Sequence, residues 1–165
     1  MTDSEFNKIV EMYSDSIYRF VLKSLRDKNT AKDLMQDVYE RVWIKRQNVN
    51  IEKAKSYLFT TAYHCMIDLI KQKNRFVSIE TANIEKNETV IIENNYNNIK
   101  EIIDELSNKL PEIQKMVLML RDYEDYSYEE IGKITGLTES QVKVYIYRAR
   151  IFLKNNLKRY QHLIF

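Results

Sequence analysis

The sequence predicts an all-α fold of two small helical domains joined by a flexible linker. The chain has 165 residues, of which 44% are hydrophobic, so it can bury one or two cores. It contains only two glycines and one proline, too few turn residues for a protein of many strands. Leu, Ile, Met, Lys and Glu recur instead at intervals of three and four residues, which is the period of an amphipathic helix.

Three helices are expected in the first domain, over residues 1–76. Apolar side chains form a helical stripe from Phe6 to Leu25, which predicts a first helix over 4–26. Thr30 is a candidate N-cap for a second helix over 31–46. A loop over 47–52 then leads into a third long helix, over 53–75.

The linker is predicted over residues 77–98. This stretch is rich in Asn and Glu, lacks a consistent hydrophobic period and isolates one short apolar patch. A second helical domain follows over 99–165, and Pro111 suits the first turn of one of its helices.

Two helix-start signals lie close together near the C-terminus. Ser127 with Glu130 and Thr138 with Gln141 each have the spacing of a capping box. Between them, Gly136 occupies the position where a helix over 128–135 needs a left-handed C-cap. A short helix, a tight turn and a long helix make a helix-turn-helix. A plain helical hairpin is the alternative, which the paired caps and the basic C-terminal end disfavour.

The long helix separates into two faces at 100° per residue. The buried stripe is predicted to consist of Val142, Ile146, Ala149 and Leu153. The opposite side carries basic residues interleaved with an aromatic residue, which suits DNA contacts.

The charge distribution agrees with a polyanion partner for the C-terminal end. The formal net charge is only +2, but residues 140–165 hold six basic side chains and no acidic one. Residues 76–109 are acidic instead. Such asymmetry is typical of a chain that contacts nucleic acid through one part.

Several other classes of protein are disfavoured. Cys65 is the single cysteine, so an internal disulfide is excluded and a reducing compartment is expected. The N-terminus lacks a signal peptide, and no apolar run approaches the roughly 20 residues that cross a bilayer, so a cytoplasmic location is predicted. The only histidines are His64 and His162, and no metal-ligand spacing or nucleotide motif is present. We therefore expect no catalytic residue, metal or cofactor.

Three stretches together resemble the sigma-70 family of RNA polymerase sigma factors, in its extracytoplasmic-function group. AKDLMQDVYERVW (31–43) resembles region 2.2, SYLFTTAYHCMIDLIKQKNR (56–75) resembles regions 2.3 and 2.4, and the sequence from Leu110 to Arg150 resembles region 4. The resemblance implies promoter-specific initiation, with core RNA polymerase (the β′ clamp helices and the β flap) and promoter DNA as partners. It also implies an anti-sigma factor.

The resemblance assigns residues to three surfaces. The polymerase-binding surface is Asp33, Gln36 and Asp37, which lie in a polar arc opposite the buried Leu34, Val38 and Val42. The −35 surface is Thr138, Lys143, Val144, Tyr147 and Arg148. The −10 surface is Asn48, Tyr57, Tyr63, His64, Lys71, Lys73 and Arg75, with residues 48–53 forming a pocket for a flipped base.

Two residues depart from the usual family pattern. His64 stands where Asn is frequent, and Tyr57 stands where Trp is common, which puts the −10 base preference in doubt. Tyr57 fits the core as well as it fits a DNA-facing position. Val144 replaces a small polar residue, so a thymine methyl group becomes its natural contact.

A stand-alone helix-turn-helix regulator with a sensing or dimerising N-terminal domain is the alternative function. It would explain the C-terminal module equally well. It would not explain the acidic arc of the second helix or the basic end of the third. Co-purification with core polymerase separates the two possibilities.

Overall fold

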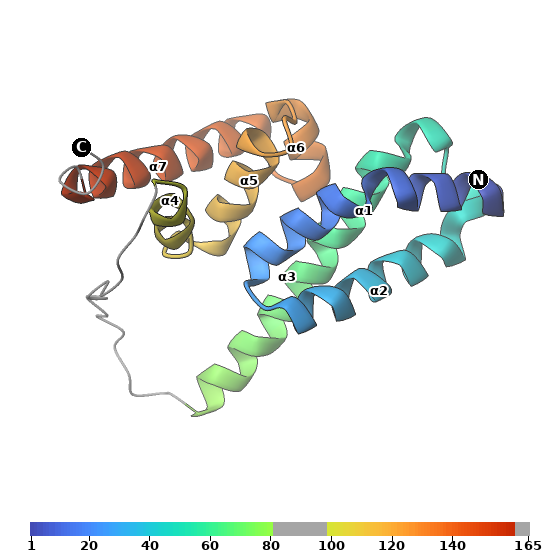
Figure 1. Ribbon diagram of the computed structural model, residues 1–165, viewed down its shortest axis with the longest axis horizontal. Helices are drawn as coiled ribbons and strands as arrows, with labels where there is room; N and C mark the ends of the chain where they lie inside the picture. Colours follow the sequence, from blue (N-terminus) through green and yellow to red (C-terminus); the bar gives the residue numbers. More distant parts are fainter. Residues whose placement is uncertain (81–98, 161–165) are drawn as a thin grey trace.

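The computed structural model describes residues 1–80 and 99–160, and this part of the chain is helical throughout, with no strand. Figure 1 shows the α-helices in chain order. Their bounds are α1 Asp3–Leu25, α2 Lys28–Lys45, α3 Ala54–Glu80, α4 Ile99–Ser107, α5 Glu112–Asp122, α6 Tyr128–Thr135 and α7 Glu139–Leu157. The all-α prediction is confirmed.

The N-terminal unit is a three-helix bundle of α1, α2 and α3. A capping box at Thr2 and Glu5 starts α1. The cap of α2 differs from the prediction: Asp27 accepts a hydrogen bond from the Thr30 N–H at 2.9 Å, so α2 begins three residues earlier than expected. Thr30 is therefore the third residue of the helix, whose N–H donates to the capping Asp27 carboxylate.

The connection between α2 and α3 is more ordered than a plain loop. Two short 3₁₀ turns, Arg46–Asn48 and Ile51–Lys53, fill it. Arg46 stacks over the Trp43 ring at 3.7 Å and pairs with Asp3 at 2.8 Å, which fastens this connection to the start of α1.

Helix α3 runs past the predicted end of the first domain. It continues to Glu80, so the first four positions of the predicted linker are helical. The remainder of that linker, residues 81–98, lies outside the described residues.

The C-terminal unit comprises α4 to α7, and its local signals match the sequence. Both capping boxes form, at Ser127 with Glu130 and at Thr138 with Gln141. Pro111 occupies the N-cap of α5, one position before the first turn where it was expected. The helix-turn-helix prediction is therefore confirmed in its bounds and in its caps.

The two units pack directly on each other. Helix α6 lies against α3, and α5 lies against α1 (Figure 1). The buried side chains of both units form one continuous cluster, in which Phe59 of α3 meets Tyr126 at 5.3 Å between ring centroids. In the described part of the chain, no helix combines the length and hydropathy required to span a membrane.

Candidate polymerase- and DNA-binding surfaces

The turn of the helix-turn-helix depends on both glycines. Gly136 has φ 77°, a left-handed conformation that glycine adopts without a steric penalty, and its N–H donates to the Gly132 carbonyl at 2.8 Å. Gly132 is needed for a different reason. A Cβ on Gly132 would lie 2.9 Å from the Leu137 carbonyl oxygen, so the turn approaches α6 too closely for any other residue. The sequence indicated the first role but not the second.

Helix α7 presents the predicted −35 residues to solvent. Its buried stripe is Val142, Ile146 and Ala149, whereas Leu153 is only half-buried. Thr138 is exposed as the N-cap of this helix, and the remaining members of the predicted set are exposed along it: Lys143, Val144, Tyr147 and Arg148. The structure thus gathers all of this set on one surface.

Two exposed residues of α7 are unusually apolar. Val144 is 43% exposed and Tyr147 is 65% exposed, and they lie three positions apart, on adjacent turns of one face. Large apolar side chains left open to water on a basic helix are suited to contact with thymine methyl groups and bases in a groove.

Arg150 is held within the protein. Its guanidinium donates to the Asp122 carboxylate at 2.6 Å and so ties α7 to the end of α5. This hydrogen bond raises the pKa of Arg150 further above its already high value. This geometry favours a structural role for Arg150 over a base-reading one.

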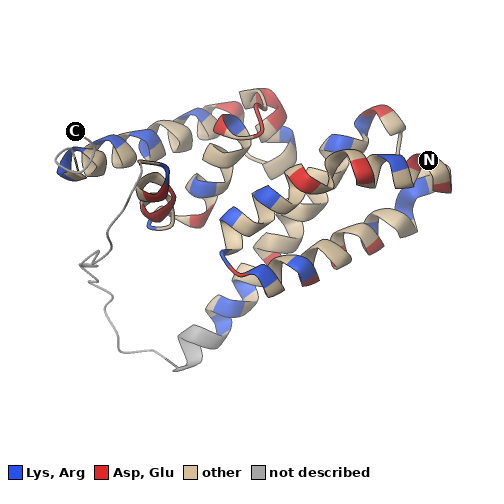
Figure 2. Ribbon diagram, viewed as in Figure 1, with Lys and Arg blue, Asp and Glu red and all other residues tan. Residues whose placement is uncertain are grey.

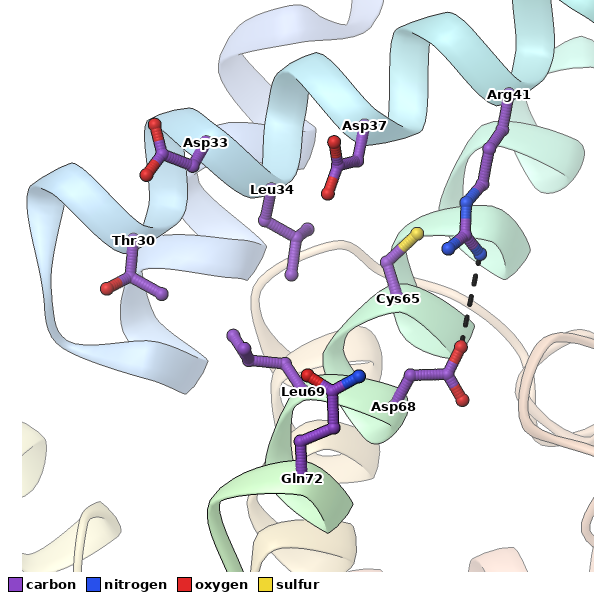
Figure 3. A pocket seen from close by; sticks show the side chains of 9 residues that line it. All are labelled: Thr30, Asp33, Leu34, Asp37, Arg41, Cys65, Asp68, Leu69 and Gln72. Carbon is purple, nitrogen blue, oxygen red and sulfur yellow. Dashed lines mark ion pairs between the residues drawn. The ribbon is translucent and has the colours of Figure 1, made fainter. Parts of the chain in front are cut away.

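The predicted polymerase-binding residues lie together on the exposed face of α2. Asp33, Gln36 and Asp37 are all exposed. Figure 3 shows Asp33 and Asp37 at the edge of a hollow of about 230 Å³ between α2 and α3, across from Asp68. Asp68 pairs with Arg41 at 4.0 Å. The sequence did not indicate that α3 extends this acidic surface, because residues 37 and 68 are brought together only by helix packing.

A second hollow, of about 350 Å³, lies between the end of α2 and the first half of α3. Its lining combines aromatic, hydroxyl and basic side chains, which are Arg41, Ile44, Lys45, Tyr57, Thr60, Thr61 and His64. His64 and Tyr57 were both assigned to the −10 surface, and the structure brings them to one hollow. Tyr57 is half-buried, and His64 is exposed.

Two members of the predicted −10 set lie elsewhere. Tyr63 is only 6% exposed and belongs to the core, where burial raises the pKa of its hydroxyl. Its assignment as a DNA contact is therefore corrected, because a buried ring supports α3 from within and cannot stack on a base. Asn48 is exposed on a 3₁₀ turn and does not line this hollow, whereas Lys53, at the other end of the segment expected to form the pocket, lines a neighbouring hollow together with Tyr57.

The second half of α3 carries the predicted phosphate-contacting residues. Lys71, Lys73 and Arg75 are exposed along its last described turns. Figure 2 shows this basic end of α3 and the basic flank of α7 as separate surfaces. Among residues 1–80 and 99–160, no group of three or more acidic, histidine or cysteine side chains has a geometry that could hold a metal ion.

Comparison with known proteins identifies the family. The model described as "Sigma-70 region 2" matches residues 9–76, and the model described as "Sigma-70, region 4" matches residues 100–153. The two matches coincide with the N-terminal bundle and with the unit that holds the helix-turn-helix. The chain belongs to the sigma-70 family, in its extracytoplasmic-function group.

Relatives of full length support this assignment. The chain is 29% identical over 150 residues to the ECF RNA polymerase sigma factor SigM of Bacillus subtilis, covering 90% of this chain and 92% of the relative. It is 26% identical over 161 residues to the RNA polymerase sigma factor YlaC of the same organism, covering 92% and 91%. A solved sigma factor, RpoE of Bartonella quintana in complex with the anti-sigma factor NepR, has a similar fold, with a TM-score of 0.74, 19% identity and coverage of 93% and 96%.

As a sigma factor, the chain acts in promoter-specific initiation of transcription, with core RNA polymerase and promoter DNA as its partners. This is the function of a non-enzymatic transcription factor. The stand-alone regulator is not favoured, because the N-terminal half matches region 2 rather than a sensing or dimerising domain.

Proposed function

We propose that this sigma factor uses three surfaces, formed by α2, α3 and α7, for three separate binding functions. The exposed acids of α2 dock on core polymerase, the exposed face of α7 reads the −35 element as duplex, and the hollow between α2 and α3 captures the opened −10 strand. The observation that supports this proposal is that α7 lines neither of the two hollows between α2 and α3, which share Arg41 but are otherwise lined by different residues.

The docking surface is suited to a basic helical partner. Asp33 and Asp37 lie four residues apart on one face of α2, and Asp68 continues the negative surface on α3. The clamp helices of the polymerase β′ subunit are the partner that the family resemblance suggests. The β flap is the corresponding candidate for the C-terminal unit.

Recognition of the −35 element combines charge and apolar contact. Lys143 and Arg148 supply positive charge on either side of Val144 and Tyr147 along α7. Lys143 also pairs with Glu139 at 3.4 Å, whereas Arg148 has no ion pair within the described residues. Arg148 is therefore the side chain best placed to exchange water for a base edge or a phosphate.

Capture of the −10 strand is assigned to the hollow lined by Tyr57 and His64. Its volume of about 350 Å³ is in the range of small-molecule sites and suits a nucleobase, and its aromatic and hydroxyl groups can stack on and hydrogen-bond to an unpaired base. The exposed Lys71, Lys73 and Arg75 extend along α3 toward its C-terminal end and can contact the backbone of the same strand.

Three further proposals accompany this mechanism. The chain requires no catalytic residue, metal or cofactor of its own, because polymerase carries out the chemistry. It acts in the cytoplasm, where polymerase and promoter DNA meet. An anti-sigma factor restrains it, as suggested by the solved sigma factor with a similar fold that is bound to such a protein.

In vitro transcription tests the proposal. Core polymerase and this chain are incubated with a promoter library, and the selected promoters define the −35 and −10 sequences. Loss of an arginine contact to a base costs about 1–3 kcal/mol of binding free energy. Arg148→Ala should therefore reduce initiation that depends on the −35 element by about tenfold, while binding to core polymerase stays unchanged. Lys109→Ala, which removes an exposed charge from the connection between α4 and α5, is the matched control. Equal loss of core binding and initiation in Arg148→Ala contradicts the assignment of docking to α2 and of −35 recognition to α7.

A further inference from the structure

The contact between the two units is built from paired charges. Arg19 and Lys23 lie one turn apart on α1, and Arg26 is the left-handed C-cap of that helix, so the three form a basic row at the C-terminal end of α1. Each meets an acid of the C-terminal unit: Arg19 with Glu124 at 3.0 Å, Lys23 with Asp104 at 3.8 Å, and Arg26 with Glu105 at 3.0 Å. A complementary row of this kind fixes one orientation of the two units.

The turn between α5 and α6 is shaped to enter this contact. Asp125 adopts a left-handed φ of 59°, and Arg121 donates to the Tyr126 carbonyl at 2.9 Å, which fixes the course of the turn. The turn thereby presents two anchors. Glu124 accepts two hydrogen bonds from Arg19 and keeps only 5% of its side chain exposed. Tyr126 packs edge-on against Phe59 of α3, beneath the Lys55 ammonium.

The same contact also buries a polar group without a partner. The Tyr126 hydroxyl has no hydrogen-bond partner among the described residues, although its ring packs against Phe59 of the other unit. A buried hydroxyl without a partner costs free energy, and separating the units would return it to water. The contact therefore carries a cost that favours opening.

Docking of the C-terminal unit places α6 beside the −10 surface. A hollow of about 510 Å³ lies between α3 and α6, with Tyr57 and Thr60 on one side and Glu130 and Lys133 on the other. Tyr57 and Thr60 also line the hollow assigned to the −10 strand. A strand held on Tyr57 and Thr60 would have to share this space with the side chains of α6.

We propose that the free chain is self-docked through the basic row of α1 and the turn at Glu124 and Tyr126, and that this closed form competes with capture of the −10 strand. The acidic surface of α2 stays exposed in the closed form, so the chain can dock on polymerase before it opens. The competition with DNA rests on the −10 surface proposed above, whereas the self-docking rests on the contacts alone.

Charge reversal in the free, full chain tests the self-docking. Arg19→Glu places two carboxylates together and should shift the ratio of closed to open forms by about tenfold or more toward open, because a charged hydrogen bond is lost. Small-angle X-ray scattering should then report a larger radius of gyration. The double variant R19E/E124R restores the ion pair with the two charges exchanged, so its radius of gyration should return toward that of the wild type. Lys8→Glu makes the same charge change on an exposed position of α1 and should leave the radius unchanged.

A second variant works in the opposite direction. Tyr126→Phe removes the unsatisfied hydroxyl and keeps the ring against Phe59, so it should favour the closed form. Binding of a single-stranded −10 oligonucleotide should be several-fold tighter to Arg19→Glu and weaker to Tyr126→Phe than to the wild type. Circular dichroism verifies that each variant is folded.

An extended wild-type chain, or the same radius for Arg19→Glu and Lys8→Glu, overturns the self-docking. If the variants differ in radius of gyration but bind the −10 oligonucleotide with equal affinity, the closed form does not compete with strand capture. Both failures are distinct from a failure of the proposed −35 surface, because Arg148 lies outside this contact and is tested separately in transcription.

Discussion

Substituting Gly132 by alanine tests the geometry of the helix-turn-helix directly. In an unstrained helix, alanine would be favoured over glycine by about 1 kcal/mol. Here the added Cβ would lie 2.9 Å from the Leu137 carbonyl oxygen, which is a backbone atom and cannot move aside alone. Overpacking of this kind costs about 1–3 kcal/mol, so we expect a net loss of roughly 0–2 kcal/mol.

That loss should be measurable both in stability and in DNA binding. For a chain of this length, each kcal/mol corresponds to about 2–4 °C in Tm, so thermal unfolding followed by circular dichroism should show a decrease of at most about 8 °C. The larger effect should be on affinity for a −35 duplex, measured by fluorescence anisotropy. The clash forces the Leu137 turn away from α6, and α7, which begins two residues later, moves with it.

Gly136→Ala is the matched control, because it replaces the other glycine of the same turn. No atom lies within 4 Å of a Cβ there, so the cost arises from the positive φ alone and amounts to roughly 1–2 kcal/mol. This variant should lose stability yet keep α7 in place, and so keep most of its −35 affinity in the folded state. A Gly132→Ala variant with a raised Tm and unchanged −35 affinity would refute the close approach of turn and helix.

Three further outcomes follow from the structure. Arg150→Ala should lower stability by about 0.5–1 kcal/mol in thermal unfolding, because both members of its pair with Asp122 are partly open to solvent, and no change in Tm would contradict the tie between α5 and α7. Asp37→Lys should weaken association with core polymerase in a pull-down while −35 duplex binding stays intact; equal association would remove α2 from the docking surface. Cys65 should resist alkylation at pH 8 in the native chain and react once it is denatured, since burial raises the pKa of its thiol and keeps it protonated, and rapid native labelling would contradict this burial.

The local features of the fold were the predictable ones. Capping boxes and a left-handed glycine act over three or four residues, so Ser127, Thr138 and Gly136 could be interpreted without knowledge of the tertiary structure. The error at Thr30 has the same origin: Asp27 is also a favourable cap, and local preference alone does not say at which of two caps three residues apart the helix begins.

The positions of side chains on α3 were harder to predict. This helix contacts α1, α2 and α6, so it is buried over a wide arc rather than along one stripe. Tyr63 falls inside that arc and His64 falls outside it, although the two are adjacent in sequence. A pattern in which apolar residues are mixed around the helix cannot assign such neighbours without knowing which helices surround it.

The contact between the two units could not be predicted at all from the sequence. Arg19 and Glu124 are 105 positions apart, and neither the helix that holds Arg19 nor the turn that holds Glu124 indicates the other residue as its partner. Only the packed structure shows that the basic row of α1 faces the acids of the C-terminal unit.

This contact couples the opening of the two units to binding at the −10 surface. Because Tyr57 and Thr60 line both hollows, α6 and the −10 strand act on the same part of α3, and the strand binds only the fraction of molecules that is open. The apparent Kd for the strand then equals the intrinsic Kd divided by that fraction. Any partner that binds the open form more tightly than the closed form raises this fraction and so tightens −10 capture without touching the strand. A −35 duplex on the exposed face of α7 has this effect only where its binding also separates α6 from α3, so the order of events at a promoter depends on which partner opens the self-docked contact.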